Sequence, residues 1–200
     1  MKTKILAALL ALMPAAAFAE LDYSYLEVAT GDYETEDGGF SFEGDGLALR
    51  GALTISDTSY LSFDYDDSTL TLTIFPVDVD VTAFSMRFGT HSAVSERTDF
   101  YAEFGFESAT LDDGGLVFGS VNDMGYSFEL GLRSQLGERF ELNGRLGYAN
   151  LGDLDTMTTV GVGAAFALVG GLSATVDYAM RNGDAFGDMT MMTFGLRYGF

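Results

Sequence analysis

The chain has 200 residues, of which 10 are Lys or Arg and 30 are Asp or Glu, so its formal net charge at pH 7 is −20. This excess of acid argues against nucleic acid or bare anionic phospholipid as a partner. Cysteine is absent, which excludes disulfides and thiolate metal sites, and the length predicts one domain.

The N-terminus has the three parts of a secretory signal peptide. Lys2 and Lys4 supply the positive charge, residues 5–13 form an apolar run, and Ala17-Phe18-Ala19 is a cleavage motif. The apolar run is too short to cross a membrane as a helix. We therefore predict that residues 1–19 are removed and that one mature domain covers residues 20–200.

Apolar residues then alternate with small or polar ones about ten times, which is the period of a β-strand. Most of these segments reach the roughly 9–11 residues that a tilted membrane-spanning strand needs. The sequence predicts an all-β fold, a transmembrane antiparallel up-and-down β-barrel of about ten strands, or of eight if two weak segments are loops. The expected strands lie near residues 21–31, 46–56, 59–69, 79–89, 98–109, 123–135, 139–150, 157–168, 172–182 and 190–200.

The expected connections alternate between short and long. Tight turns are predicted at residues 56–58, 137–138 and 169–171, with a slightly longer one at 91–97. Long loops are predicted at 32–45, 66–78, 111–122, 151–156 and 182–189. Short periplasmic turns and longer extracellular loops are typical of outer-membrane barrels.

The predicted long loops are acidic and contain no basic residue. Such loops could attract divalent cations, which would bridge them to the phosphates of lipopolysaccharide. No segment matches the spaced ligands of an EF-hand, so we favour the interpretation that these loops are simply solvated. We therefore predict no dedicated metal site and no cofactor.

One face of each predicted strand is apolar enough to contact lipid. The segment 98–109, for example, sends Phe100, Phe104 and Phe106 outward. In the first strand we assign Leu26 outward and Glu27 inward, because a carboxylate on the lipid face is costly.

The inward face carries most of the charge. The residues predicted to form a charge network in the lumen are Glu27, Arg50, Asp64, Arg87, Asp99, Glu103, Glu129, Arg133, Glu141, Arg145, Asp177, Arg181 and Arg197. Residues paired across a hairpin have a constant sum of residue numbers, which yields specific pairs. One register pairs Glu129 with Arg145 and Arg133 with Glu141, another pairs Arg50 with Asp64, and a turn centred on Ala93 would pair Arg87 with Asp99. These pairs either fill a narrow barrel or line a thin polar path.

Catalytic residues are not expected. The only histidine, His91, falls in a predicted periplasmic turn, so a histidine-based or thiol-based mechanism has no carrier. The adjacent Asp66 and Asp67 are interpreted as solvated loop residues. We predict that the protein is not an enzyme.

The last predicted strand ends the chain on an aromatic residue. Phe194, Leu196, Tyr198 and Phe200 share one parity. Together with the export signal, this pattern resembles the assembly signal of small Gram-negative outer-membrane β-barrel proteins, the porin-like and OmpA-transmembrane-domain-like group. The resemblance implies location in the outer membrane, contact with its lipids and lipopolysaccharide, and recognition of the last strand by the barrel-assembly machinery.

Two functional hypotheses follow. The first is a narrow, cation-preferring path for ions or small solutes. The second is a plugged structural or surface-interaction barrel, whose acidic outer loops bind divalent cations, lipopolysaccharide or another partner.

Overall fold

The computed structural model describes residues 21, 23–37, 40–74, 77–115, 119–183 and 187–200, so the predicted signal peptide lies outside the described residues. Ten strands make up the fold: β1 (Tyr25–Asp37), β2 (Phe40–Ser56), β3 (Ser59–Leu72), β4 (Asp78–Ser95), β5 (Thr98–Asp112), β6 (Ser120–Gln135), β7 (Phe140–Asn150), β8 (Thr156–Val169), β9 (Leu172–Gly183) and β10 (Gly187–Gly199). In this part of the chain we find no helix with the length and apolar character to cross a membrane.

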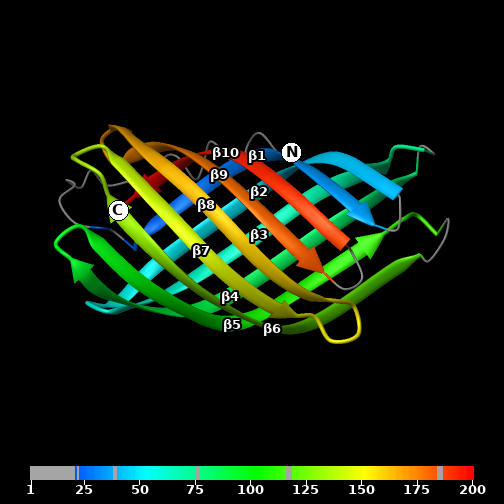
Figure 1. Cartoon of the computed structure of the whole chain (residues 1–200), viewed down its shortest axis with the longest axis horizontal. Helices are drawn as coiled ribbons and strands as arrows, with labels where there is room; N and C mark the ends of the chain where they lie inside the picture. Colours follow the sequence, from blue (N-terminus) through cyan, green and yellow to red (C-terminus); the bar gives the residue numbers. More distant parts are fainter. Residues whose placement is uncertain (1–20, 22, 38–39, 75–76, 116–118, 184–186) are drawn as a thin grey trace.

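Each strand pairs with the next in antiparallel fashion, and β1 pairs with β10 to close the barrel (Figure 1). The predicted all-β, ten-stranded, up-and-down barrel is confirmed, and the eight-strand alternative is wrong. Closure satisfies the backbone hydrogen bonds that an open sheet would leave at its edges, which a strand crossing lipid requires.

Both ends of the described chain lie at one end of the barrel, since Tyr25 pairs with Gly199. We call this the terminal end; it also carries the turns that follow β2, β4, β6 and β8. The opposite end, which we call the loop end, carries the connections that follow the odd-numbered strands. In Figure 1 the terminal end is on the left.

The long loops predicted at residues 32–45, 66–78 and 182–189 are wrong, because most of these residues belong to strands, and the one predicted at 111–122 is shortened to residues 113–119. β1 and β2 stay paired from Tyr25↔Ala52 as far as Asp37↔Phe40. In water the outward face of a strand tolerates carboxylates, because backbone pairing does not depend on that face. Most of the acidic segments are therefore extensions of the strands, while the connection at 151–155 agrees with its prediction and that at 113–119 agrees in part.

The predicted turn at residues 91–97 is also wrong in part. β4 continues to Ser95, so His91 lies in a strand, opposite Tyr101 of β5. The register shifts between Ala93 and Ser95, and the chain reverses only at residues 96–97. Arg97 and Arg139 are exposed at turns of the terminal end.

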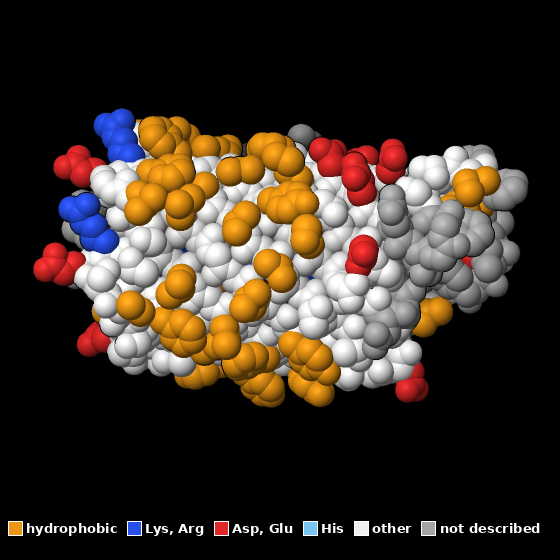
Figure 2. Space-filling model, viewed as in Figure 1, with side chains coloured by type: hydrophobic (Ala, Val, Ile, Leu, Met, Phe, Trp, Pro, Cys, Tyr) orange, Lys and Arg blue, Asp and Glu red, His pale blue; other side chains and the backbone are white. Residues whose placement is uncertain are grey.

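The outward face of the barrel forms an apolar belt. Its exposed residues include Leu53, Phe88, Phe104, Phe128, Leu146, Val162, Tyr178 and Phe194. Figure 2 shows apolar side chains over the terminal and middle parts of the barrel, with acidic side chains beyond them both toward the loop end and, next to basic ones, at the terminal tip. Tyr198 shares the parity of Phe194 but is buried, and its ring lies beside Phe200.

Candidate functional site

A continuous chain of ion pairs occupies the terminal and middle parts of the lumen. Glu27 is its centre: the side chain, on β1, accepts from Arg50 of β2 at 3.0 Å and from Arg197 of β10 at 2.8 Å. Glu27 is only 1 % exposed, so two guanidinium groups neutralise a carboxylate that is withdrawn from solvent.

From Glu27 the chain continues in both directions around the barrel. On one side Asp64 lies 3.7 Å from Arg50 and 2.9 Å from Arg87. Arg87 in turn lies 3.4 Å from Glu103. On the other side Glu141 lies 3.8 Å from Arg197 and accepts two hydrogen bonds from Arg133, at 2.9 and 3.0 Å.

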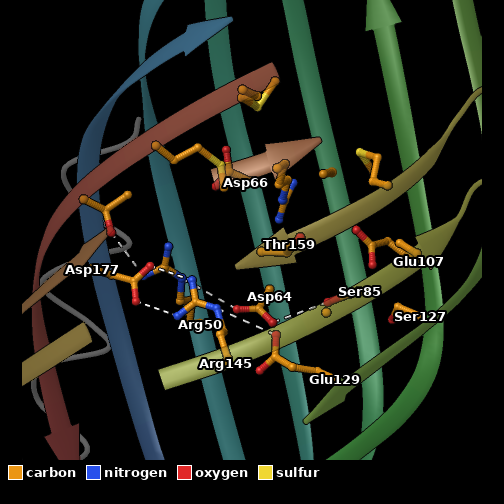
Figure 3. Close-up of a pocket in the computed structure, with 18 of the residues that line it drawn as sticks. Arg50, Asp64, Asp66, Ser85, Glu107, Ser127, Glu129, Arg145, Thr159 and Asp177 are labelled. Carbon is orange, nitrogen blue, oxygen red and sulfur yellow. Dashed lines mark hydrogen bonds and ion pairs between the residues drawn. The ribbon is translucent and has the colours of Figure 1, made fainter. Parts of the chain in front are cut away.

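A second cluster centres on Arg145 of β7. Its two terminal nitrogens each donate to Asp177 of β9 at 2.6 Å, which is the bidentate geometry that guanidinium and carboxylate groups favour. Its Nε lies 3.7 Å from Glu129 of β6, which also accepts from the Tyr101 hydroxyl at 2.8 Å. Figure 3 shows Arg145 between Asp177 and Glu129, close to Arg50 and Asp64.

The backbone makes room for this cluster through glycine. A Cβ atom added to Gly161 of β8 would lie 2.8 Å from Cζ of Arg145. A Cβ on Gly163 would lie 2.7 Å from Asp177 Oδ2. These two inward glycines therefore lie directly beneath the Arg145–Asp177 pair.

The predicted hairpin registers have different outcomes. Arg50 lies opposite Asp64, as predicted. The β6–β7 register is shifted by two residues, because the chain reverses over residues 136–139: Arg145 faces Gly131, and Arg133 faces Asn143. Both predicted contacts nevertheless form diagonally, since a shift of two keeps every side chain on its face and arginine is long enough to reach.

The pairing of Arg87 with Asp99 is wrong. Arg87 lies opposite Gly105, because the β4–β5 turn comes later than Ala93. Asp99 instead contacts His91, whose Nδ1 lies 3.1 Å from Asp99 Oδ2. Arg181 lines the lumen as expected but takes part in none of the ion pairs found among the described residues.

Aromatic side chains narrow the lumen at the terminal end. Tyr23, just before β1, is 4 % exposed and stacks on His91 with a centroid distance of 4.1 Å. Its ring also lies 4.6 Å from that of Tyr60 and 4.4 Å from Cζ of Arg133. Nothing in the sequence predicts this cluster, because it brings together Tyr23 before β1, Tyr60 of β3 and His91 of β4, which are far apart in the chain.

Several acidic residues at the loop end have structural roles. Asp113 accepts hydrogen bonds from the backbone N–H groups of Gly115 and Gly119, both at 2.9 Å. Asp123 accepts from those of Met124 and Asp153, both at 2.8 Å. Within the described ranges no three acidic or histidine side chains come together as a metal site would require.

The lumen contains a cavity of about 410 Å³, lined by residues from Tyr23 and Arg133 near the terminal end to Leu70 and Val79 near the loop end. Asp66, interpreted from the sequence as a solvated loop residue, points into it and accepts a hydrogen bond from the Tyr33 hydroxyl at 2.8 Å. The parity of Asp66 matches that of Asp64, and this was the signal that could have placed it inside.

Comparisons with known proteins agree with this architecture. A family model described as outer membrane protein beta-barrel domain matches residues 5–166. No curated protein sequence matches the chain significantly.

Similar solved structures include the beta domain of the Bordetella autotransporter BrkA (TM-score 0.56, 14 % identity, 88 % of this chain and 99 % of that chain covered). An outer membrane channel from Pseudomonas putida F1 is also similar (TM-score 0.55, 11 % identity, 94 % and 100 % covered). The translocator domain of the autotransporter NalP from Neisseria meningitidis is another (TM-score 0.51, 12 % identity, 100 % and 95 % covered). At these identities the likeness concerns the fold. With the family model spanning most of its length, the chain belongs to the outer membrane protein β-barrel domain family and is a protein of the outer membrane.

Proposed function

We propose that the barrel is porin-like and forms a narrow path for ions or small solutes, with a preference for cations. The observation that carries this proposal is the charge of the cavity wall. The lining residues include eight carboxylates and six guanidinium groups, so the wall has two more negative than positive charges. A narrow, poorly hydrated path with net negative walls favours cations.

The position of the excess charge supports the same preference. Glu27, Glu141 and Asp177 are each within 3.0 Å of a guanidinium nitrogen. Glu107 is not, since its contact with Arg87 is 3.9 Å long. A cation in the path would thus find its least compensated carboxylates beyond the ion-pair chain, on the side toward the loop end.

The test is conductance of the refolded mature protein in a planar bilayer with a KCl gradient across it. We expect small discrete steps of current and a reversal potential whose sign indicates selectivity for cations. Charge reversal at Arg50 or Arg145 should change both the size of the steps and the reversal potential. Arg181→Gln should increase the cation preference. Glu96→Gln, at an exposed turn, is the matched control and should change neither. A folded, heat-modifiable barrel without steps would exclude the channel.

A plugged barrel with an interacting surface is the second candidate, and a specific observation favours it. On the outward face at the loop end, Asp32 lies directly opposite Asp45 and Glu34 opposite Glu43. Like charges in direct cross-strand pairs repel, and a divalent cation or a cationic partner would relieve the repulsion. If conductance is absent, the melting temperature of the barrel in Ca²⁺ is compared with that in K⁺ at matched ionic strength. A higher melting temperature in Ca²⁺ would support the second candidate.

Three further proposals belong to this assignment. The protein is not an enzyme: His91 is stacked beneath Tyr23, and its Nδ1 lies within hydrogen-bonding distance of Asp99. Lipopolysaccharide surrounds the outer part of the apolar belt. The barrel-assembly machinery recognises β10, whose outward Phe194 and Leu196 are exposed and whose strand precedes Phe200.

A further inference from the structure

The part of the cavity nearest the loop end has an apolar wall, in contrast to the charged part below it. Leu70 of β3, Val79 of β4, Leu111 of β5 and Leu151, just after β7, all line the cavity and are buried. Met157, Met189 and Met191 complete this wall from the other side. The lumen of an outer-membrane barrel is ordinarily polar, so an inward ring of leucine, valine and methionine needs an explanation.

An apolar wall that borders a cavity favours a ligand with an apolar body. Water in such a space lacks hydrogen-bond partners, and methionine side chains adapt to ligands of different shape. The cavity volume of about 410 Å³ falls within the range of roughly 300–1,000 Å³ that small-molecule pockets occupy.

Beneath the apolar wall lie carboxylates that the ion-pair chain does not neutralise. Glu107 is 6 % exposed, yet its nearest guanidinium contact is Arg87 Nη2 at 3.9 Å, and no described residue donates a hydrogen bond to it. Arg87 is occupied by shorter contacts with Asp64 and Glu103. The only hydrogen bond to Asp66 among the described side chains comes from the neutral hydroxyl of Tyr33.

Figure 3 shows how these groups are arranged. Glu107 and Asp66 come from different strands and lie on opposite sides of the space above the Arg145 cluster. Leu70 follows Asp66 on the same inward face of β3, and Leu111 follows Glu107 on that of β5. A ligand that places a positive charge at the carboxylates would therefore place its apolar body against the leucines.

We propose that the loop-end half of the lumen binds small organic cations with an apolar body, of the aryl- or alkylammonium class. The inference rests on the proposed function, because it names what the cation-preferring path takes up. Arg181 lines the same cavity and would attract an anion, but it is one guanidinium beside two incompletely neutralised carboxylates. The charge balance of the site thus favours the cation over an equally apolar anion.

The test measures equilibrium binding by titration calorimetry of the mature protein in phosphatidylcholine nanodiscs, with empty nanodiscs as the reference. The probes are benzylammonium, benzyl alcohol and phenylacetate, which share an aromatic ring but differ in charge. Benzylammonium should bind about tenfold or more tightly than the other two, since a hydrogen bond to a charged group contributes that much. Glu107→Gln should remove this advantage, and Leu111→Ala should weaken the binding of benzylammonium and benzyl alcohol alike.

The control is Glu96→Gln, which removes a carboxylate at an exposed turn of the terminal end and should leave all three affinities unchanged. Far-UV circular dichroism and heat-modifiable gel mobility verify that each variant is folded. Equal affinity for the three probes, tighter binding of phenylacetate, or no binding above empty nanodiscs would overturn the proposal. Because calorimetry requires no conduction, binding by a barrel that is silent in the bilayer would refute the channel but retain the site.

Discussion

Arg145 illustrates how a single side chain holds together distant parts of the wall. It joins β7 to β9 through the bidentate contact with Asp177 and to β6 through Glu129, so one guanidinium connects three strands. Its side chain retains 19 % exposure and that of Asp177 15 %, so water from the cavity reaches the pair. Removal of one partner leaves the other charge in a poorly solvated site.

We predict that Arg145→Ala lowers the free energy of unfolding by about 3 kcal/mol, at the lower end of the range for a buried pair because of this residual exposure. Urea unfolding in lipid vesicles, followed by circular dichroism, measures the change. The double variant with Asp177→Asn should lose less than the sum of the single variants, because the stranded charge is then removed. A cost well below 1 kcal/mol for Arg145→Ala would show that the pair contributes nothing to stability.

Tyr23 is a second single residue with a predicted effect, in this case on the path through the lumen rather than on stability. Its ring is held by stacking on His91 and by the guanidinium of Arg133, yet its backbone lies outside the strands. Truncation of this ring removes one tyrosine of the aromatic cluster without breaking a ladder hydrogen bond.

Tyr23→Ala is therefore expected to raise single-channel conductance in the planar bilayer. Tyr178→Ala, which removes a tyrosine ring from the outward face of β9, should leave the conductance unchanged. Unchanged conductance in Tyr23→Ala would place the narrowest point of the path elsewhere.

At the scale of the strand, each element has a part suited to lipid and a part suited to water. β5 sends Phe100, Phe104 and Phe106 outward near the terminal end and middle, and Asp112 outward at the loop end. On β3 the exposed Leu61 and Tyr65 are followed by Asp67 and Thr69. The same strand therefore crosses the apolar belt and continues beyond it.

This division predicts opposite effects of a new arginine. Phe104→Arg should cost about 2–4 kcal/mol relative to Phe104→Ala, because the charge enters the apolar belt. Thr69→Arg should be neutral or stabilising by about 0.2–1 kcal/mol, because Thr69 lies between Asp45 and Asp80 on the neighbouring strands. Urea unfolding in vesicles compares the variants, and a similar cost at both positions would contradict the proposed limits of the belt.

At the scale of the whole molecule, the distribution of charge determines how the stability of the barrel responds to salt. The six lumen arginines are grouped with the inward carboxylates, while the outward face at the loop end has acid without base among its described residues. The compact barrel therefore brings like charges close together at one end.

We predict that a rise in NaCl concentration from about 0.05 to 0.5 M stabilises the protein, since the Debye length shortens from more than 10 Å to only a few ångströms. The increase should be smaller in the double variant Asp45→Asn with Glu43→Gln, which removes two repulsive cross-strand pairs. Thermal unfolding at each salt concentration measures it. Destabilisation by salt would show that attractive pairs in the lumen dominate the exposed electrostatics.

The sequence by itself determined the closed antiparallel fold and the two faces of the wall, and it favoured ten strands over eight. The physical reason is that lipid tolerates few charged side chains, so the period of two must persist wherever a strand crosses the membrane. The inward position of Glu27 followed from the same constraint. The acidic extensions of β1 and β2 were mistaken for loops, because outside the membrane the outward face no longer needs to be apolar.

Only the tertiary structure decided which charges meet. The β6–β7 register depends on the conformation of residues 136–139, and a difference of two residues leaves the hydrophobic pattern unchanged. The contact of Glu27 with Arg197 joins residues that are 170 positions apart and exists only because β1 closes against β10. The apolar wall above Glu107 and Asp66 depends likewise on several strands together, since β3, β4, β5, β8 and β10 each contribute only one or two of its residues.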